Sequence, residues 1–390
     1  MAQQILAYLS FSLYEIIALS ALFLFFLIQI LLYVLHYAAP LRYVKSKAEA
    51  DEEHDAQRQM PFVSVIITSE NESENLAEHL PLLLTQDYPN YEIIVVNSGS
   101  TDESDFLLLS LQHKYPNLYH TYLPPNSLDK KFDRRKLALT LGIKAAKGDV
   151  LLFTEPYCRP MSTRWIASMM QPMEADKEIV LGYSFYSSSR KFYNRIARFD
   201  NLLFSLDYIQ RALKGKPFTG IYRNLAYRKH LFFDNKGFAS VLNVDGGEQV
   251  FLNNIMNATN TSVALDQDSF VETRIDSGIL WRQMKRSYSF VKSHFKKYHS
   301  LRTIDSFTRY MFYLIFSLLV AYGIYASQWG VLAVTVLLFV VLLIVQGILL
   351  SKSAKYFFSG KFALSLPVLS LMQPICNAMC KKGTFRKKKK

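Results

Sequence analysis

Polar residues that could take part in catalysis or binding stand at the ends of three short β-branched or aliphatic runs. These polar groups are Ser69-Glu70-Asn71-Glu72 after residues 62–67, Asn97-Ser98-Gly99-Ser100 after residues 91–96, and Glu155 after residues 150–153. Ligands of parallel α/β sheets bind at the carboxyl ends of the strands, so we expect these groups in one crevice. Together they predict a nucleotide site, where a carboxylate can also hold the hard cation that bridges phosphates.

The elements that must position these groups alternate between strand and helix. We expect strands at 62–67, 91–96, 118–123 and 150–153, and helices at 72–84, 102–112 and 133–147. This order predicts an α/β fold with a mostly parallel sheet and helices on both faces. No GxGxxG follows the first strand and the sequence has no GxxxxGK[ST], which disfavours dinucleotide enzymes and P-loop NTPases.

Composition narrows the class of protein. Hydrophobic residues make up 50% of the 390 residues, which excludes a disordered chain, and three cysteines cannot form a disulfide scaffold. Seven positive charges of the net +13 lie in the last ten residues, so the other 380 residues have a net charge of only +6. The basicity is that of a tail, and we expect no nucleic-acid partner.

Three apolar runs have the length of membrane spans. Residues 16–35 carry no charge, 330–350 are clearly long enough, and 310–326 are short but usable, with a buried core helix as the alternative. The chain opens Met-Ala-Gln-Gln without Lys or Arg, which favours an uncleaved anchor over a signal peptide.

Basic residues predict the orientation of these spans. They follow the first span (Arg42, Lys45, Lys47), precede the second (Arg302, Arg309) and follow the third (Lys352, Lys355, Lys361). The positive-inside rule then places residues 42–305 and the C-terminus in the cytoplasm. Residues 363–380 contain Pro367 and Pro374 and are predicted to be an interfacial or re-entrant segment. The basic tail is expected on anionic lipid headgroups, with a solvated tail as the alternative.

The predicted organisation has six parts. They are an N-terminal region with its anchor (1–41), a linker (42–60), a globular domain (61–305), two transmembrane helices (306–351), the interfacial or re-entrant segment (352–380) and the basic tail (381–390).

Six stretches of the globular domain carry a family resemblance. They are PFVSVIITSENESENL (61–76), YEIIVVNSGSTDES (91–104), RRKLALTLGIKAAKGDVLLFTEPYCRPMSTRWI (134–166), GIYRNLAYRKHLFF (220–233), GGEQVFLNNI (246–255) and WRQMKR (281–286). In this order they resemble the family 2 glycosyltransferases, which have the Rossmann-like GT-A fold, and the anchors resemble a membrane-bound bacterial subgroup. The resemblance covers about residues 60–300.

The resemblance implies an inverting sugar transfer. A carboxylate deprotonates an acceptor hydroxyl, which displaces a nucleoside diphosphate from the anomeric carbon of the sugar. The implied partners are a nucleotide-sugar donor, a lipid-linked or glycan acceptor and membrane lipids. The implied location is the bacterial inner (plasma) membrane.

The resemblance also implies a divalent cation, Mg²⁺ or Mn²⁺. The family pattern Asp-x-Asp is matched by Glu155-Pro156-Tyr157, in which Glu155 can be a metal ligand but Tyr157 is a poor one, since its reference pKa is about 10. Metal binding is then weaker, rearranged or absent, and a strand-end turn with an incidental Glu is the alternative.

Glu248 matches the position of the catalytic base. Asp245, three residues earlier, is the reserve candidate, and a solvated surface loop is the alternative to both.

The remaining site residues are assigned by the same resemblance. Ser69, Glu72, Asn97 and Ser98 would line the nucleoside pocket, and Lys136, with Arg135 nearby, would face the diphosphate. Gln283 and Arg286 would hold the diphosphate or the acceptor, and Arg223 and Asn224 would shape the acceptor side. Turn chemistry is the alternative for Asn97 and Ser98, a solvated helix face for Lys136, and a lipid-binding basic patch for Arg286.

Two functions remain open from the sequence. The first is a membrane-anchored inverting glycosyltransferase. The second is a degenerate family member that acts as a scaffold in a glycan-assembly complex, which the altered Glu155-Pro156-Tyr157 triplet motivates. A processive synthase is disfavoured because three spans are too few for a polymer channel.

Overall fold

The computed structural model describes residues 11–50, 60–123, 134–173, 176–275, 277–296 and 301–382. The chain forms two compact units. Of these residues, those between 43 and 296 and 378–382 belong to a globular unit, and 11–42 and 301–377 belong to a helical unit.

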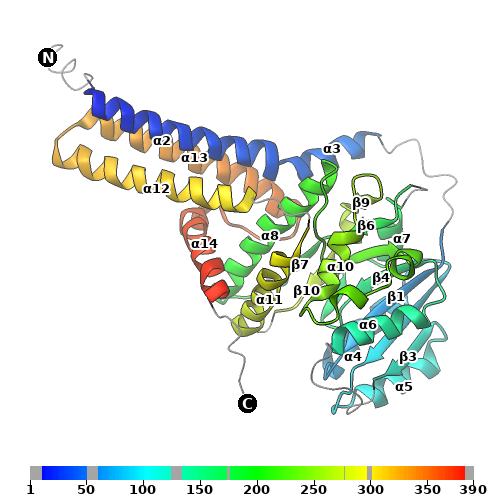
Figure 1. Cartoon of the computed structure of the whole chain (residues 1–390). Helices are drawn as coiled ribbons and strands as arrows, with labels where there is room; N and C mark the ends of the chain where they lie inside the picture. Colours follow the sequence, from blue (N-terminus) through cyan, green and yellow to red (C-terminus); the bar gives the residue numbers. More distant parts are fainter. Residues whose placement is uncertain are drawn as a thin grey trace. The chain divides into compact units, whose positions relative to one another are not determined.

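The globular unit is built on a seven-stranded sheet with the order β3-β2-β1-β4-β8-β6-β9 (Figure 1). Its parallel strands are β1 (Val63–Ser69), β2 (Tyr91–Asn97), β3 (Leu118–Tyr122) and β4 (Val150–Thr154). Beyond them lie β8 (Leu225–Arg228), antiparallel to β4, then β6 (Ile179–Leu181), antiparallel to β8, and β9 (Thr261–Val263), parallel to β6. The predicted α/β fold and its four strands are confirmed.

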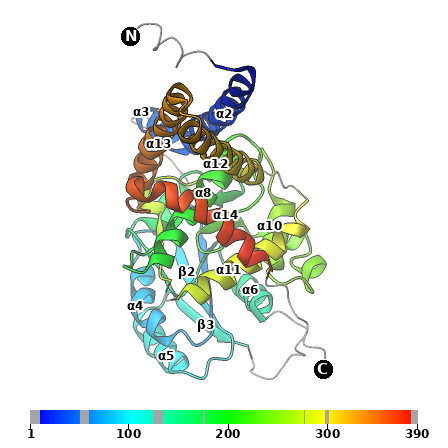
Figure 2. The same cartoon turned by 90° about the vertical axis from the view of Figure 1, so that its left-hand side faces the viewer.

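Three helices connect the parallel strands, as predicted. They are α4 (Ser73–Leu84), α5 (Ser104–Lys114) and α6 (Arg134–Ala145). Figure 2 shows α4 and α5 on one side of β2 and β3 and α6 on the other.

Side chains of β1 alternate between these two helical layers. Val63 and Val65 lie in one hydrophobic core with Leu80 of α4. Ile66 points to the opposite face, where it meets α6 at Gly142. A Cβ atom at Gly142 would lie 2.8 Å from Cγ2 of Ile66, so a glycine is what lets the helix approach the sheet this closely. Both faces of β1 are therefore buried, as its β-branched sequence predicts.

The second half of the globular unit adds a small sheet and further helices. The sheet has the order β5-β10-β7 and consists of β5 (Cys158–Pro160), β10 (Val271–Thr273) and β7 (Ser184–Tyr186). The α-helices are α7 (Trp165–Met170), α8 (Phe192–Leu213), α9 (His230–Asp234), α10 (Gly247–Ile255) and α11 (Gly278–Val291). Short 3₁₀ helices are η3 (Ala239–Val241), η4 (Gln267–Ser269) and η5 (Lys292–His294).

The helical unit contains the three apolar runs. Helix α2 (Leu13–Leu31) continues through a π-helical segment, η1 (Leu32–Tyr37), toward α3 (Ala39–Ala50), and α12 (Leu301–Tyr325) and α13 (Trp329–Tyr356) lie beside α2 (Figure 1). Three helices, Leu13–Ser46, Leu301–Tyr325 and Trp329–Tyr356, are long and apolar enough to cross a membrane. The second begins nine residues before the predicted start of the apolar run, and its added turns carry Arg302, Asp305 and Arg309.

The apolar segment near the C-terminus is helical. It forms η6 (Ala363–Ser365) and α14 (Leu366–Lys382). Pro367 stands in the first turn, where no intrahelical N–H donor is needed, and Pro374 lies inside the helix. The two prolines therefore do not interrupt the helix. Its interfacial or re-entrant position stays a prediction.

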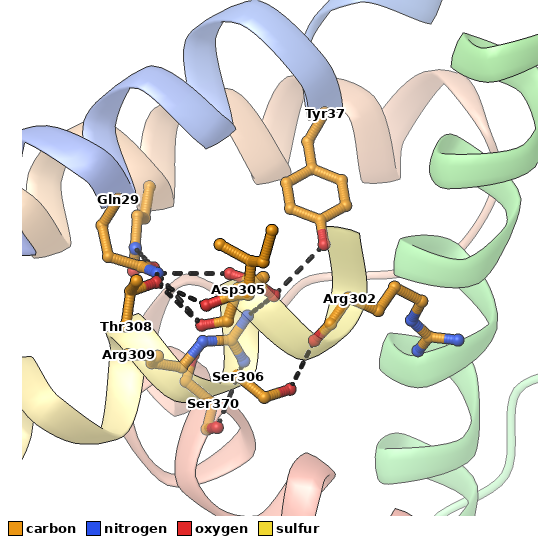
Figure 3. Close-up of polar contacts among 10 residues, drawn as sticks. Gln29, Tyr37, Arg302, Asp305, Ser306, Thr308, Arg309 and Ser370 are labelled. Atoms are coloured by element: carbon orange, nitrogen blue, oxygen red, sulfur yellow. Dashed lines mark hydrogen bonds and ion pairs between the residues drawn. The ribbon is translucent and has the colours of Figure 1, made fainter. Parts of the chain in front are cut away.

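A buried polar cluster joins the helices of this unit (Figure 3). Arg309 and Asp305 of α12 form an ion pair in which both side chains are at most 5% exposed. Gln29 of α2 donates to the Oδ1 of Asp305 at 3.3 Å, and the Tyr37 hydroxyl donates to its Oδ2 at 3.2 Å. Arg309 also donates to the Ser370 carbonyl of α14 at 3.2 Å. The pair thus fixes α12 against three other elements, α2, η1 and α14.

Asp305→Ala should destabilise the protein strongly. It leaves the Arg309 guanidinium buried without its counter-ion, which costs about 3–5 kcal/mol. The melting temperature of the detergent-purified chain measures this loss. Ser317→Ala is the matched control on α12, because its exposed hydroxyl bonds only its own helix. An Asp305→Ala/Arg309→Met double variant should recover part of the loss, and no recovery would contradict the explanation by an uncompensated charge.

Candidate active site

The loops after β1 and β2 form one structural unit at the carboxyl edge of the sheet. Ser69 pairs with Asn97 in the parallel register, and the Ser98 N–H donates to the Ser69 carbonyl at 2.7 Å. The Asn71 N–H donates to the Ser100 hydroxyl at 2.8 Å. The polar groups predicted at these two strand ends therefore do lie together.

Asn97 and Ser98 are buried in the turn that they build. The Asn97 Oδ1 accepts from both the N–H and the hydroxyl of Ser100, at 2.9 and 2.6 Å, while its Nδ2 donates to Asp105 at 2.5 Å. The Ser98 carbonyl accepts from Arg134 at 2.5 Å. Turn chemistry therefore describes the Asn97 side chain, and its proposed role in the nucleoside pocket stays a prediction.

Ser69 and Glu72 differ in what their side chains contact. The Ser69 hydroxyl is buried and has no hydrogen-bond partner among the described residues. Glu72 is half-buried and accepts from Asn75 at 2.5 Å.

The central feature of the site is one guanidinium between two carboxylates. Arg135, the second residue of α6, donates to Glu155 at the end of β4, and its Nε lies 3.3 Å from Oε1 of Glu248 in the first turn of α10. Glu155 and Glu248 are only 5% and 8% exposed, whereas Arg135 is 35% exposed. The predicted metal ligand and the predicted base therefore share one site. Asp245, the reserve base, is exposed.

The two carboxylates also fix the charge of Arg135. Burial acts to lower its pKa, but the charges of Glu155 and Glu248 outweigh burial, so the pKa of Arg135 is raised well above its usual value. The guanidinium remains protonated.

The turn before α10 holds Glu248 in place. Gly246 has φ +69°, and a Cβ atom at Gly247 would lie 2.5 Å from the Val241 carbonyl oxygen, so both positions require glycine. The buried Lys136 ammonium donates to that same carbonyl at 3.0 Å and to the carbonyl of Val244. Lys136 therefore joins α6 to this turn, whereas its predicted contact with a diphosphate remains untested.

Sequence reasoning named Arg135 only as the neighbour of Lys136. Consecutive residues of a helix point about 100° apart, so only one of the two could face the sheet edge. The signal that separates them, the rotation of α6 about its axis, is not in the sequence.

The Glu155-Pro156-Tyr157 triplet after β4 offers poor ligands to a divalent cation. Burial raises the pKa of the Tyr157 hydroxyl far above its usual range, so it is a neutral phenol rather than an anionic ligand. Glu155 is already paired with Arg135. Among the described residues, no three His, Cys, Asp or Glu side chains gather where they could hold a metal ion. These donors do not fit a divalent cation at Glu155.

Arg223 is a second buried cation near this triplet. It is 8% exposed, donates from Nε to the Ser184 hydroxyl at 3.2 Å and lies 5.3 Å above the ring of Tyr186. Burial acts to lower its pKa, but interactions with Tyr186 and Tyr157 raise it above the usual value. Arg223 therefore stays charged beside Tyr157.

Asn224 is part of the core. It is fully buried, donates to the carbonyls of Tyr183 and Ser269 at 2.9 and 2.7 Å, and accepts from the Trp165 indole at 3.1 Å. Its side chain thus links three separate parts of the chain. Contact between Asn224 and an acceptor stays a prediction.

The last predicted pair lies on α11. Gln283 is exposed, and the side chain of Arg286 lies outside the described residues. Lys285, between them, forms an ion pair with the buried Asp200 of α8. This pair anchors α11 to α8 within the globular unit.

Comparison with known proteins gives one family. Residues 64–234 match the model described as Glycosyl transferase family 2. The chain is 32% identical to Glycosyltransferase AglE of Haloferax volcanii over 103 residues. The aligned stretch covers 26% of this chain and 32% of that protein. The chain is equally identical over 103 residues to the dolichyl N-acetyl-alpha-D-glucosaminyl phosphate 3-beta-D-2,3-diacetamido-2,3-dideoxy-beta-D-glucuronosyltransferase of Methanococcus voltae, which is 26% of this chain and 30% of that protein. The matched segments span about a third of each relative.

A solved structure shares the fold. The mannosyltransferase PcManGT from Pyrobaculum calidifontis, in complex with GDP-Man and Mn²⁺, superposes with a TM-score of 0.52 at 16% identity, over 92% of this chain and 99% of that chain. The likeness shows the GT-A fold.

Lys136→Met separates two roles for this lysine. Because its ammonium binds main-chain carbonyls, we expect a loss of about 1–3 kcal/mol of stability, measured as a lower melting temperature. Lys144→Met, at an exposed position of the same helix, is the control. An unchanged melting temperature together with weaker nucleotide binding would instead support the predicted contact with the diphosphate.

Proposed function

We propose that this chain, whose residues 64–234 are a domain of glycosyltransferase family 2, transfers a sugar from a nucleotide-diphosphate sugar to a lipid-linked or envelope glycan acceptor, with inversion at the anomeric carbon. The observation that carries the proposal is the meeting of Glu155 and Glu248 on Arg135. Carboxylates from separate parts of the chain and a permanent positive charge lie together beyond the end of β4.

In this proposal Glu248 is the general base. The acceptor O–H bond breaks and its proton moves to the Glu248 carboxylate, while the acceptor oxygen forms a bond to the anomeric carbon. The bond from that carbon to the diphosphate breaks on the opposite side, and its electron pair stays on the leaving oxygen. Positive charge must stand where this negative charge develops. Arg135 and Arg223 are guanidinium groups whose positive charges both act on Tyr157, at the end of the triplet.

The proposed setting is the bacterial inner (plasma) membrane. Three helices long enough to cross a membrane support an integral membrane enzyme, and the basic residues beside them favour a cytoplasmic globular unit. The name of the Methanococcus voltae relative gives it a dolichyl-linked acceptor, which supports a lipid-linked acceptor here.

A scaffold without catalysis is the second candidate. One observation favours it: Arg135 is paired with both the candidate base and the candidate metal ligand. A direct assay of sugar transfer distinguishes the enzyme from the scaffold.

Glu248→Gln should abolish transfer while leaving donor binding intact. The amide cannot accept the proton, and the loss of a general base lowers the rate by about 10²–10⁴-fold. The measurement is release of nucleoside diphosphate from a panel of nucleotide-sugars, together with nucleotide affinity. Asp234→Asn, at a position whose side chain is 68% exposed, is the control.

Two results would redirect the assignment. Transfer that persists in Glu248→Gln and disappears in Asp245→Asn would make Asp245 the base. Donor binding without any turnover by the wild-type protein would favour the scaffold.

Reporter fusions test the orientation. Alkaline phosphatase, which is active only outside the cytoplasm, should be active when fused after Gln328 and inactive when fused after Lys390. Fluorescent protein fusions at the same two positions should give the opposite pattern. Activity after Lys390 would contradict the cytoplasmic C-terminus.

A further inference from the structure

The charge of the Glu155 turn is balanced without a divalent cation. The family pattern of two acidic side chains would carry a charge of −2, which a divalent ion neutralises. Here residue 157 is a tyrosine, which carries no charge at neutral pH, so the triplet carries only the charge of Glu155. The guanidinium of Arg135 pairs with that carboxylate and neutralises it. Glu155, Tyr157 and Arg135 together therefore carry no net charge, as an occupied metal site would.

Exposure makes Arg135 the group that an incoming anion meets first. Its side chain is 35% exposed, while Glu155 and Glu248 are nearly buried beneath it. Arginine suits this position because its planar fork can bind a carboxylate and a phosphate oxygen at the same time. Arg223, whose charge also acts on Tyr157, supplies a second positive charge.

We propose that the Arg135 guanidinium takes the place of the divalent cation in this chain, so that it binds the diphosphate of the donor and neutralises the charge that develops on the leaving oxygen without a metal ion at Glu155. The inference rests on the proposed function, because it assigns the diphosphate part of that donor.

The same contact links donor binding to the base. The Nε of Arg135 lies 3.3 Å from Glu248, at the long end of the hydrogen-bond range. A diphosphate that takes over this side of the guanidinium releases Glu248 from its ion pair. A carboxylate freed in this way is a better proton acceptor, so the base becomes competent only when the donor is bound.

Nucleotide binding with and without metal tests the inference. The full-length chain in detergent is titrated with UDP, GDP, CDP and ADP by calorimetry, in EDTA and then with Mn²⁺ or Mg²⁺. For the nucleotide that binds, we expect its Kd to differ by less than about threefold between the two conditions, because no metal contact is made or lost. Arg135→Gln should weaken binding by about tenfold to hundredfold in both, as expected for loss of a charge-assisted hydrogen bond.

Three further variants keep the test sharp if Arg135→Gln is unstable. Lys144→Gln removes one positive charge from an exposed position of the same helix and should leave affinity unchanged. Arg135→Lys keeps the charge but loses the fork, and should give an intermediate affinity. Arg135→Gln/Tyr157→Asp restores an acidic pair, and should make nucleotide binding depend on Mn²⁺ and deplete free Mn²⁺ in electron paramagnetic resonance, which the wild-type protein should not do.

The outcomes distinguish failure of this inference from failure of the proposed glycosyltransferase function. Nucleotide binding that EDTA abolishes and Mn²⁺ restores in the wild-type protein would overturn the role of Arg135 while leaving the glycosyltransferase proposal intact. A wild-type protein that binds none of the nucleotides in either condition would overturn both.

Discussion

The candidate active site depends on the ion pairs that Arg135 makes with Glu155 and Glu248. Two carboxylates with less than a tenth of their surface exposed would repel one another and lose most of their hydration. One guanidinium between them compensates both effects, and it ties the start of α6 to the end of β4 and the start of α10. Lys136 strengthens the same connection from the other side, because it holds the carbonyls of the turn that leads into α10. The two adjacent basic residues thus have separate roles. Arg135 pairs with the two carboxylates, and Lys136 positions the backbone turn that precedes Glu248.

The helical unit also contains a buried guanidinium, but its surroundings give it a different role. Arg309 is 3% exposed and is enclosed by Asp305 and the Ser370 carbonyl (Figure 3). No anion can reach it without opening the helices, so its pairing serves packing. Arg135 has a third of its side chain in contact with solvent. The same chemical group is therefore structural where it is enclosed and available to a ligand where one side remains open, and exposure decides between the two.

Long apolar elements could be predicted from the sequence, and short ones could not. The parallel strands and their helices were predicted because β-branched runs such as 62–67 are buried on both faces. The strands of the second sheet have three residues each, such as β5 (Cys158–Pro160), and such lengths carry no periodicity. Pro374 lies within a helix, although proline disfavours a helix interior because it lacks an N–H donor. In the site, Glu155 and Glu248 were predicted by position, whereas the choice of Arg135 over Lys136 depends on how α6 is rotated against the sheet, and only packing determines that.

The Glu155-Pro156-Tyr157 triplet and Arg135 form one electrostatic arrangement. An acidic residue at 157 would add a second negative charge beside Glu155, which the single charge of Arg135 could not neutralise once Glu248 shares it. A neutral phenol at 157 without Arg135 would leave Glu155 buried and unpaired, which is costly. Tyr157 adds no charge and Arg135 supplies a counter-ion to Glu155, so the two side chains together keep the Glu155 turn neutral. The GT-A sheet accommodates this arrangement because the strands that carry it are held by their own apolar faces, so the chemistry at their ends can vary while the fold remains.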